Sequence, residues 1–349
     1  YAAEYVALFL SEIASPGIAY EYQLMQRLLP GITLDEANAW IAHLVTPDNR
    51  AIIVQAPEKT DLTLPTETEL VATVEAAAAK KLEPYVDQLS QDALLETIPA
   101  AAAIVSEQTL PELDVTDITL ANGVRVLMKP TTFKNDEVLF SATSPGGDSL
   151  VSDEDYPEAS LATSWIETGG VGTLTQTELG KLLAGTLAGA SPMIGELSEG
   201  FAGTASPDDL ETALQLVYLY ATQPRADGDA FQVLQQQLRT GLKNRALDPE
   251  SALNDALAEI FCGTGVRCRP LTLAEVDALD QARAYEIYRE RFSDFSDFTF
   301  TFVGSFETSE LKRLAQVYLG NLPSTGRKET WRNVRGDLPE EIIEKTLRK

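Results

Sequence analysis

The chain has 349 residues, 44% of them hydrophobic and 23% charged, which is the composition of a globular protein large enough for about two domains. Its formal net charge of −26 argues against a nucleic-acid partner or an anionic membrane surface, because both attract clustered Lys and Arg. No apolar run approaches the roughly 18 residues of a membrane-spanning helix. The acidity would suit a basic peptide partner, although a highly soluble exported or bacterial protein explains it more simply.

Residues 1–57 predict a partial α+β unit. The spacing of apolar residues predicts one helix up to Ile13, a second that ends near Pro30 and a third that starts at Leu34. The apolar run Ala51–Val54 predicts a buried strand. Because the chain starts inside a helical pattern rather than at a Met, we expect it to be a piece of a longer protein.

Residues 58–113 have the composition of an interdomain linker. Prolines interrupt them repeatedly, and most of the segment is acidic and poorly periodic. An Ala-rich stretch predicts one helix over roughly Glu67 to Lys81. We expect the rest of the linker to be extended.

Residues 114–325 predict a complete domain that opens with a β-hairpin. Two short apolar runs, Ile118–Leu120 and Val124–Met128, are separated by a turn at Asn122-Gly123. Asn and Gly accept the positive φ that such a turn needs, so this is a strong hairpin signal.

The rest of the domain mixes strands and helices. The pattern predicts, in chain order, a strand at Glu137–Thr143, a helix at Pro157–Glu167, a helix begun by Thr175, strands at Ser191–Leu197 and Gly200–Ala205, helices up to Tyr220, at Asp227–Arg245 and at Asp248–Phe261, a helical pair from Thr272, a strand at Phe298–Val303 and a helix at Thr308–Leu319. From this order we predict an α+β fold, with a mainly antiparallel sheet and helices packed on one face.

The stretch Asp117–Gly172 resembles the opening of a half-molecule in the insulinase/pitrilysin family of zinc metallopeptidases. In the catalytic domain of that family, the helix before the Gly-rich turn carries His-x-x-Glu-His. Aligned on Gly169, the motif positions fall on Ser160, Thr163 and Ser164, which can neither hold zinc nor act as the base. The resemblance therefore implies the non-catalytic third domain of the family, with its insulinase/pitrilysin-like (LuxS/processing-peptidase-like) fold.

The resemblance covers nearly the whole chain and implies four consecutive parts. These are the C-terminal part of a second peptidase-like domain (1–57), the interdomain linker (58–113), the complete non-catalytic domain (114–325) and a connection towards a missing fourth domain (326–349). A short internal echo fits this arrangement, since Ile32–Glu36 and Leu271–Glu275 each precede helices and then a strand-like run. In the family all four domains share one fold, so we expect a partial second copy of it in this chain.

The resemblance also implies an activity for the parent protein. In the family two His and a downstream Glu hold Zn²⁺, and the motif Glu activates the attacking water. The parent is thus expected to be a zinc metalloendopeptidase whose halves close around a chamber for peptides or small proteins. The fragment itself is expected to be inactive and to hold no zinc. Its partners would be those substrates and the catalytic half of the same chain, with no nucleic acid and no membrane, in the bacterial periplasm or another exported location.

A second hypothesis is a non-enzymatic scaffold or assembly subunit that kept the peptidase fold but lost the zinc site. It predicts that the full-length sequence also lacks His-x-x-Glu-His upstream of this chain. The full-length reading frame would separate the two hypotheses.

Other candidate metal ligands have simpler explanations. The single histidine, His43, lies near the end of a predicted helix, where a solvated side chain is expected, and one imidazole cannot form a two-His zinc site. An acidic run lacks the alternating ligands and central Gly of a calcium loop, so we expect it to be a solvated loop. Its members are Asp148, Asp153, Glu154, Asp155 and Glu158.

Two cysteines, Cys262 and Cys268, flank a Gly-Thr-Gly loop. A disulfide between them would suit an oxidising compartment, and two free thiols are an equal alternative. Arg267 and Arg269 lie in the same stretch and could contact peptide carboxylates, but we expect their side chains to be solvated.

Overall fold

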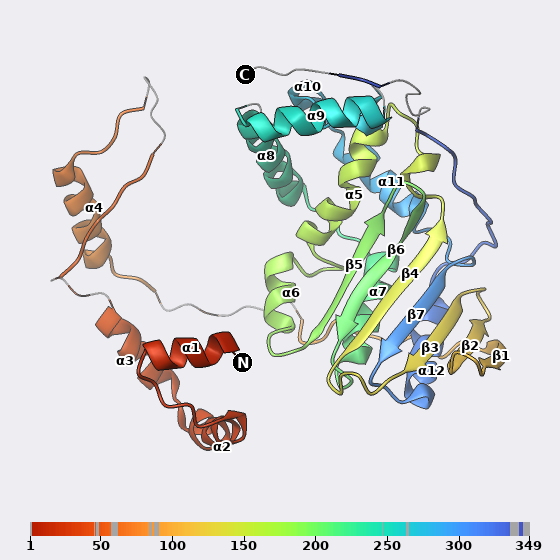
Figure 1. Ribbon diagram of the computed structural model, residues 1–349, viewed down its shortest axis with the longest axis horizontal. Helices are drawn as coiled ribbons and strands as arrows, with labels where there is room; N and C mark the ends of the chain where they lie inside the picture. Colours follow the sequence, from red (N-terminus) through yellow and green to blue (C-terminus); the bar gives the residue numbers. More distant parts are fainter. Residues whose placement is uncertain are drawn as a thin grey trace. The chain divides into compact units, whose positions relative to one another are not determined.

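The structure is a computed structural model that describes residues 2–44, 46, 49–56, 62–83, 86, 91–245, 247–262, 265–335 and 342–344. It divides into two compact units, residues 1–86 and residues 87–349 (Figure 1). Among the described helices, none is both long and apolar enough to span a membrane.

The described part of the N-terminal unit is helical. Helices α1 (Ala2–Leu10), α2 (Ile18–Leu28) and α3 (Leu34–Leu44) confirm the three helices expected there, and a 3-10 turn, η1 (Leu29–Gly31), joins α2 to α3. Helix α4 (Glu67–Ala79) confirms the helix predicted in the linker. No residue of α1, α2 or α4 is buried, so the apolar side chains of these helices lack a core.

The strand predicted at Ala51–Val54 is wrong. These residues have no regular secondary structure, and Ile53 is 80% exposed. A strand needs a neighbour for its backbone hydrogen bonds, and none of the described residues of this unit forms one. The internal echo therefore extends to the helix but not to a following strand.

The C-terminal unit is built on a 7-stranded sheet with the order β1-β2-β3-β7-β4-β6-β5 (Figure 1). Every pairing is antiparallel except that of β3 with β7. The strands are β1 (Ile104–Leu110), β2 (Val115–Leu120), β3 (Arg125–Pro130), β4 (Val138–Pro145), β5 (Ala188–Ile194), β6 (Ser198–Ala205) and β7 (Thr299–Gly304).

The end of the predicted linker belongs to this sheet. Residues 58–113 were expected to contain only one helix, but Ile104–Leu110 pairs with β2 as an edge strand. The amide of Ala102 also donates to the carbonyl of Gln316 at 2.8 Å. Most side chains of β1 are exposed on both faces, so its sequence lacks the apolar alternation that marks a half-buried strand.

The hairpin between β2 and β3 turns at Asn122-Gly123, as predicted. Gly123 has φ +95°, and a Cβ built there would lie 2.7 Å from the carbonyl oxygen of Ser296, so only glycine fits. The Asn122 side chain donates to the carbonyls of Leu319 and Leu322, at 2.9 and 3.1 Å. The turn is therefore held by the C-terminal part of the domain as well as by its own geometry.

Helices cover one face of the sheet. Side chains along β4 alternate between buried and exposed, which is typical of a sheet with one solvated face. In the core, Phe140 and Phe302 stack with ring centroids 5.3 Å apart. The helical elements are η2 (Gly147–Leu150), α5 (Tyr156–Gly169), α6 (Gln176–Leu182), α7 (Leu210–Thr222), α8 (Gly228–Arg245), α9 (Pro249–Cys262), η3 (Val266–Cys268), α10 (Leu273–Ala278), α11 (Gln281–Arg291), α12 (Thr308–Val317) and η4 (Leu319–Asn321). The predicted fold class is confirmed.

Candidate functional site

Helix α5 carries the three residues that the resemblance aligns with a zinc-binding motif. Ser160, Thr163 and Ser164 lie within one turn of each other on this helix, and both serines are exposed while the threonine is half-buried. The opposite side of α5 is buried through Leu161, Ala162, Trp165 and Ile166. The hydroxyl groups therefore lie on the side of α5 away from the core, on a helix that packs against β5 and α11.

The ends of α5 follow from its local sequence. Pro157 lies in the first turn, where its fixed φ suits a helix and its missing N–H costs no hydrogen bond. At the other end, Gly170 has φ +92°, and a Cβ built there would lie 2.2 Å from the carbonyl oxygen of Leu174. Any other residue would be strained and would clash, so the helix stops at this glycine.

The hydroxyl groups on α5 make local hydrogen bonds. Ser160 Oγ donates to the carbonyl of Pro157 at 2.8 Å, and the carbonyl of Ser164 accepts from Thr168 Oγ1 at 2.8 Å. Neutral hydroxyls are not among the usual zinc ligands, which are thiolate, imidazole and carboxylate. Within the part of the chain that the structure describes, no group of three or more His, Cys, Asp or Glu is placed to hold a metal ion. His43 lies exposed on α3 of the other unit.

A buried ion pair between Arg267 and Asp148 lies near the N-terminal end of α5. The Arg267 side chain is 8% exposed, and its Nη1 lies 2.7 Å from Asp148 Oδ1. Its Nε lies 2.8 Å from Asp153 Oδ1, and its guanidinium lies over the ring of Tyr156, 4.6 Å from the centroid. The expectation that Arg267 is solvated is therefore wrong, because the residue joins η3 to the loop between β4 and α5.

The acidic run is more buried than predicted. Glu158 is 8% exposed and accepts a hydrogen bond from the amide of Asp280 at 3.0 Å. Asp155 Oδ2 lies 2.8 Å from Arg283 Nη2. Both contacts join α5 to the start of α11. The prediction of a solvated loop is wrong for these two residues and for Asp148, because their partners come from segments distant in the sequence.

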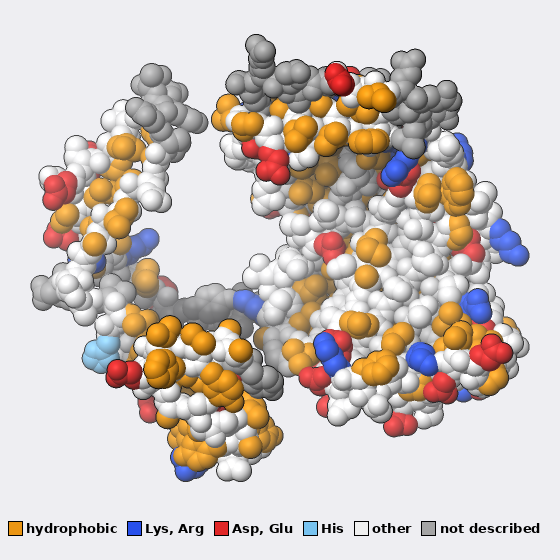
Figure 2. Space-filling model, viewed as in Figure 1, with side chains coloured by type: hydrophobic (Ala, Val, Ile, Leu, Met, Phe, Trp, Pro, Cys, Tyr) orange, Lys and Arg blue, Asp and Glu red, His pale blue; other side chains and the backbone are white. Residues whose placement is uncertain are grey.

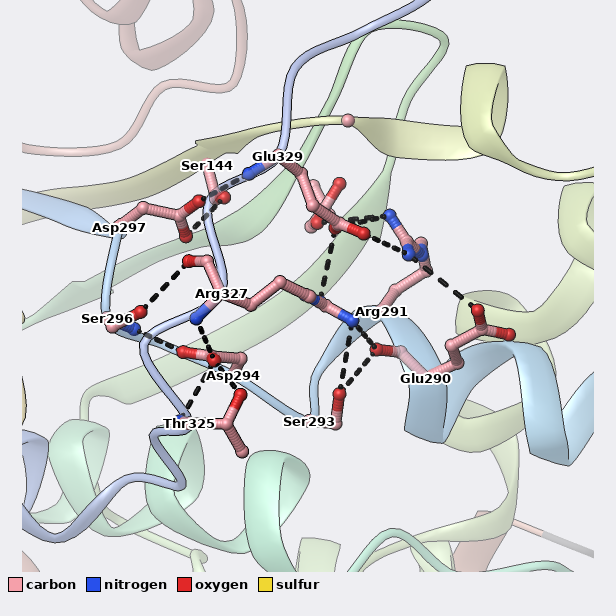
Figure 3. A network of polar contacts seen from close by, with 12 residues as sticks. Ser144, Glu290, Arg291, Ser293, Asp294, Ser296, Asp297, Thr325, Arg327 and Glu329 are labelled. Carbon is pink, nitrogen blue, oxygen red and sulfur yellow. Dashed lines mark hydrogen bonds and ion pairs between the residues drawn. The ribbon is translucent and has the colours of Figure 1, made fainter.

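A second buried ionic group links β6, α11 and the C-terminal segment (Figure 3). Arg291 Nη1 lies 3.6 Å from Glu199 Oε1, and these residues are only 3% and 2% exposed. The same guanidinium lies 3.0 Å from Glu329 Oε2. Glu199 also accepts a hydrogen bond from the amide of Gly147, in the turn that precedes α5. None of these residues was predicted from the sequence to belong to a site.

The sequence nevertheless contained a signal for this pair. Arg291 continues the helical spacing of three buried residues on α11, namely Ala284, Ile287 and Tyr288. Glu199 shares the strand face of Phe201, two positions along β6. A charge on each apolar face could have predicted that the two side chains are buried against one another.

Comparisons with known proteins point to one group of enzymes. The chain is 28% identical over 322 residues to a zinc protease PQQL-like protein of Arabidopsis thaliana, covering 92% of this chain and 31% of that protein. It is 24% identical over 253 residues to the probable zinc protease PqqL of Escherichia coli, covering 72% of this chain and 27% of that protein. The resemblance to the insulinase/pitrilysin family is confirmed.

Solved structures show the same fold as this insulinase/pitrilysin-like chain. The crystal structure of the periplasmic protease PqqL from Escherichia coli has a TM-score of 0.61 at 22% identity, covering 95% of this chain and 37% of that chain. A mutant of the ferredoxin protease FusC in complex with Arabidopsis ferredoxin has a TM-score of 0.61 at 16% identity, covering 96% and 37%. No family model matches the chain. The chain spans about a third of the length of the relatives that it matches.

The buried carboxylates Asp148 and Glu199 are expected to make this insulinase/pitrilysin-like domain less stable as the pH rises. Burial raises the pKa of Asp148 from 3.8 to about 6, against the lowering effect of Arg267. Burial raises the pKa of Glu199 from 4.5 to about 7, against the lowering effects of the Gly147 amide and Arg291. Between the ordinary and raised values the folded state holds protons that the unfolded state has released, so the free energy of unfolding falls as the pH rises.

Urea unfolding near pH 5 and near pH 8 measures this effect in the unmodified protein and in Glu199→Gln. We expect the unmodified protein to lose about 1–3 kcal/mol more of its unfolding free energy between these conditions than the variant does, since each unit of pKa shift corresponds to about 1.4 kcal/mol. Equal losses in the two proteins would show that Glu199 titrates normally in the fold.

The assignment of Ser160, Thr163 and Ser164 to the family's motif positions stays a prediction, and α5 offers a direct test. In the variant Ser160→His/Ser164→His, the two imidazoles would lie one turn apart on an exposed face, which is the spacing that binds zinc in helical motifs. We expect calorimetric titration to show Zn²⁺ binding at least about tenfold tighter than in the unmodified chain. The control Ser160→His/Thr168→His separates the imidazoles by two turns, or about 12 Å, and should give no gain.

Two predictions remain, the disulfide between Cys262 and Cys268 and the solvated side chain of Arg269. Cys268 is buried in η3, whereas the side chain of Cys262 lies outside the described residues, so the disulfide stays a prediction. Arg269 is exposed, as expected, and pairs with Glu275 at 2.6 Å.

Proposed function

We propose that this chain is the non-catalytic region of a zinc-dependent metalloendopeptidase and forms part of the chamber that encloses peptide substrates. The single observation that carries the proposal is helix α5. This helix ends at a glycine, and Ser160, Thr163 and Ser164, which the resemblance aligns with the zinc-binding motif, lie on its side away from the core. The relatives with which it aligns are named zinc proteases, and it spans about a third of their length.

Protein or peptide substrates are supported by one of the structural neighbours. FusC was solved as a complex with ferredoxin, so a protein of this fold holds another protein. We infer that the present chain would help to enclose the substrate without taking part in the chemistry, because the residues that the resemblance aligns with the zinc-binding motif are Ser160, Thr163 and Ser164, and hydroxyls are not usual zinc ligands. An exported location is supported by the periplasmic origin stated for PqqL of Escherichia coli.

The experiment compares this chain with the full-length polypeptide that contains it. We expect the pure chain to bind no stoichiometric zinc and to cleave no member of a peptide library. The full-length protein should carry zinc and lose its peptidase activity on chelation, and Ser164→Ala within it should leave kcat unchanged. Zinc-dependent cleavage by the pure chain would overturn the proposal, and a full-length protein without zinc would support the scaffold hypothesis.

The N-terminal unit is proposed to be the rear part of a second domain of the same fold. In both units a 3-10 turn leads to a helix with a reciprocal Thr–Glu capping pair. The amide of Glu36 donates to Thr33 Oγ1 at 3.2 Å, and the amide of Glu275 donates to Thr272 Oγ1 at 3.2 Å. The exposed apolar side chains of α1–α3 would pack against an upstream part of the parent polypeptide.

The isolated chain is therefore expected to self-associate through α1–α3. Apolar side chains gather over these helices (Figure 2), among them Phe9, 82% exposed, and Trp40, 67% exposed. Sedimentation velocity should show dimers or larger species at high concentration, and Phe9→Ser/Trp40→Ser should shift the protein towards monomer. The control Leu139→Ser changes a half-exposed residue on the open face of the sheet and should have no such effect. A strictly monomeric unmodified chain would contradict the expectation.

A further inference from the structure

The segment Pro323–Arg335 crosses the C-terminal unit without regular secondary structure, and side chains of the domain hold its backbone. Asp294, only 2% exposed, is the main anchor. One oxygen of its carboxylate accepts from the amide of Thr325 at 2.9 Å, from the amide of Arg327 at 2.8 Å and from the Thr325 hydroxyl. The other oxygen accepts from the amide of Ser296 at 2.8 Å (Figure 3). A single buried carboxylate thus fixes two alternate amides of the segment.

Two further amides of the segment also donate to side chains. The amide of Glu329 donates to Asp297 Oδ2 at 3.4 Å, and the other oxygen of Asp297 accepts from Ser144 Oγ at 2.9 Å. Further along, the amide of Arg332 donates to Ser149 Oγ at 3.0 Å. Carboxylates and a hydroxyl thus accept from backbone amides of the segment in the place of a neighbouring strand, although the segment is not a strand itself, since Gly326 has φ +78°.

The segment is also connected to the turn before α5. Glu329 is paired with buried Arg291, whose guanidinium also faces Glu199, and Glu199 accepts the amide of Gly147. Ser149 provides a second connection, because its Oγ donates to the carbonyl of Gly146 at 2.6 Å while it accepts from the segment. The two connections reach the same turn from separate points of the segment.

We propose that Pro323–Arg335 is a docked strap that detaches from the domain as one unit, and that its docking is coupled to the Gly146–Ser149 turn, which precedes α5. The strap then belongs to the domain rather than to the connection that we expected over residues 326–349. A docked strap would therefore help to fix the N-terminal part of α5, which carries Ser160.

The charge state of Asp294 favours the docked state of the strap near neutral pH. Burial by itself would raise the pKa of Asp294, but the hydrogen bonds from Thr325, Ser296 and Arg327 outweigh it and lower the pKa below its ordinary value. Hydrogen bonds to an ionised acceptor are stronger than those between neutral groups. Three charged groups surround the pair of Arg291 and Glu199, namely Glu329, Glu290 and Arg327. Glu329 and Glu290 both face Arg291, and Arg327 pairs with Glu329.

Hydrogen exchange on the whole chain tests the proposal at the level of single amides. In the unmodified protein, the amides of Thr325, Arg327 and Arg332 should exchange at least about tenfold more slowly than the same residues in an unstructured peptide. Asp294→Asn should remove most of that protection at all three positions together, since the segment detaches as a unit. The amides of Gly147 and Ser149 should then exchange about tenfold faster as well.

Two further variants separate the ion pair from the Asp294 anchor and provide a control. Glu329→Gln removes the ion pair but leaves the Asp294 anchor, so it should speed exchange at Gly147 more than at Thr325. Lys328→Gln, an exposed change on the strap, should alter neither group of amides. Unchanged protection in β7 shows that each variant is folded. Exchange of the strap at unstructured rates in the unmodified protein would overturn the docking, and a turn that stays protected when the strap detaches would overturn the coupling.

Discussion

Replacing Trp165 by Ala is expected to destabilise the C-terminal unit by about 3–5 kcal/mol, the usual range for removing a buried Trp or Phe. The side chain is fully buried on the inner face of α5, and its Nε1 donates to the carbonyl of Asp227 at 2.8 Å. Its ring meets Phe231 of α8 edge-on, with centroids 5.3 Å apart, and Tyr285 of α11 at 6.2 Å. The substitution would leave a cavity where three helices meet and would remove the main packing contact of α5.

Equilibrium unfolding in urea measures this loss, with Ser164→Ala as the matched control on the same helix. Ser164 is exposed, so its replacement should change the free energy of unfolding by no more than about 0.5 kcal/mol. If Trp165→Ala cost no more than the control, α5 would not be held by the contacts described above.

The variant Arg291→Ala is expected to be as damaging, by a different mechanism. It removes the cation between two acidic groups and leaves Glu199 buried without its partner, a change that typically costs about 3–5 kcal/mol. Protonation of Glu199 relieves part of this cost, so the loss should be larger near pH 8 than near pH 5. Unfolding curves at both pH values would show the difference.

Two comparisons separate the charge from the lost volume. Arg289→Ala removes an exposed arginine from the same helix and should be nearly neutral. The double variant Arg291→Met/Glu199→Gln keeps the volume without the charges, and it should recover much of the stability lost in Arg291→Ala. A double variant as unstable as the single one would mean that packing, rather than the unpaired carboxylate, accounts for the loss.

Elements that depend on local spacing were predictable from the sequence. The turn at Asn122-Gly123 and the helix at Pro157–Glu167 were placed correctly, because turn residues and apolar periodicity act over a few neighbouring positions. The Ser and Thr residues of α5 could also be aligned with a known motif, since the glycine that ends the helix gives a reference point. These local signals were enough to predict the fold class and the resemblance.

Whether a weakly patterned segment forms a strand depends on the presence of a neighbouring strand. Ile104–Leu110 reads as a linker, yet it forms β1 because β2 offers its free edge. Ala51–Val54 has the apolar run of a strand, yet it forms none among the described residues of its unit because no neighbouring strand is there. Backbone hydrogen bonds between strands are made with distant residues, which periodicity within one segment does not identify.

By itself, the sequence determined the order of elements, the apolar faces and the presence of hydroxyl side chains, rather than imidazole or carboxylate, at Ser160, Thr163 and Ser164 of α5. Only the tertiary structure decided that Arg267 and Arg291 are buried, and that Asp294 holds the strap. A charged side chain is stable in the interior only opposite a particular partner, and these partners come from η2, β6 and the C-terminal segment. Burial of a charge is therefore a property of the assembled fold, whereas apolar spacing is a property of each segment.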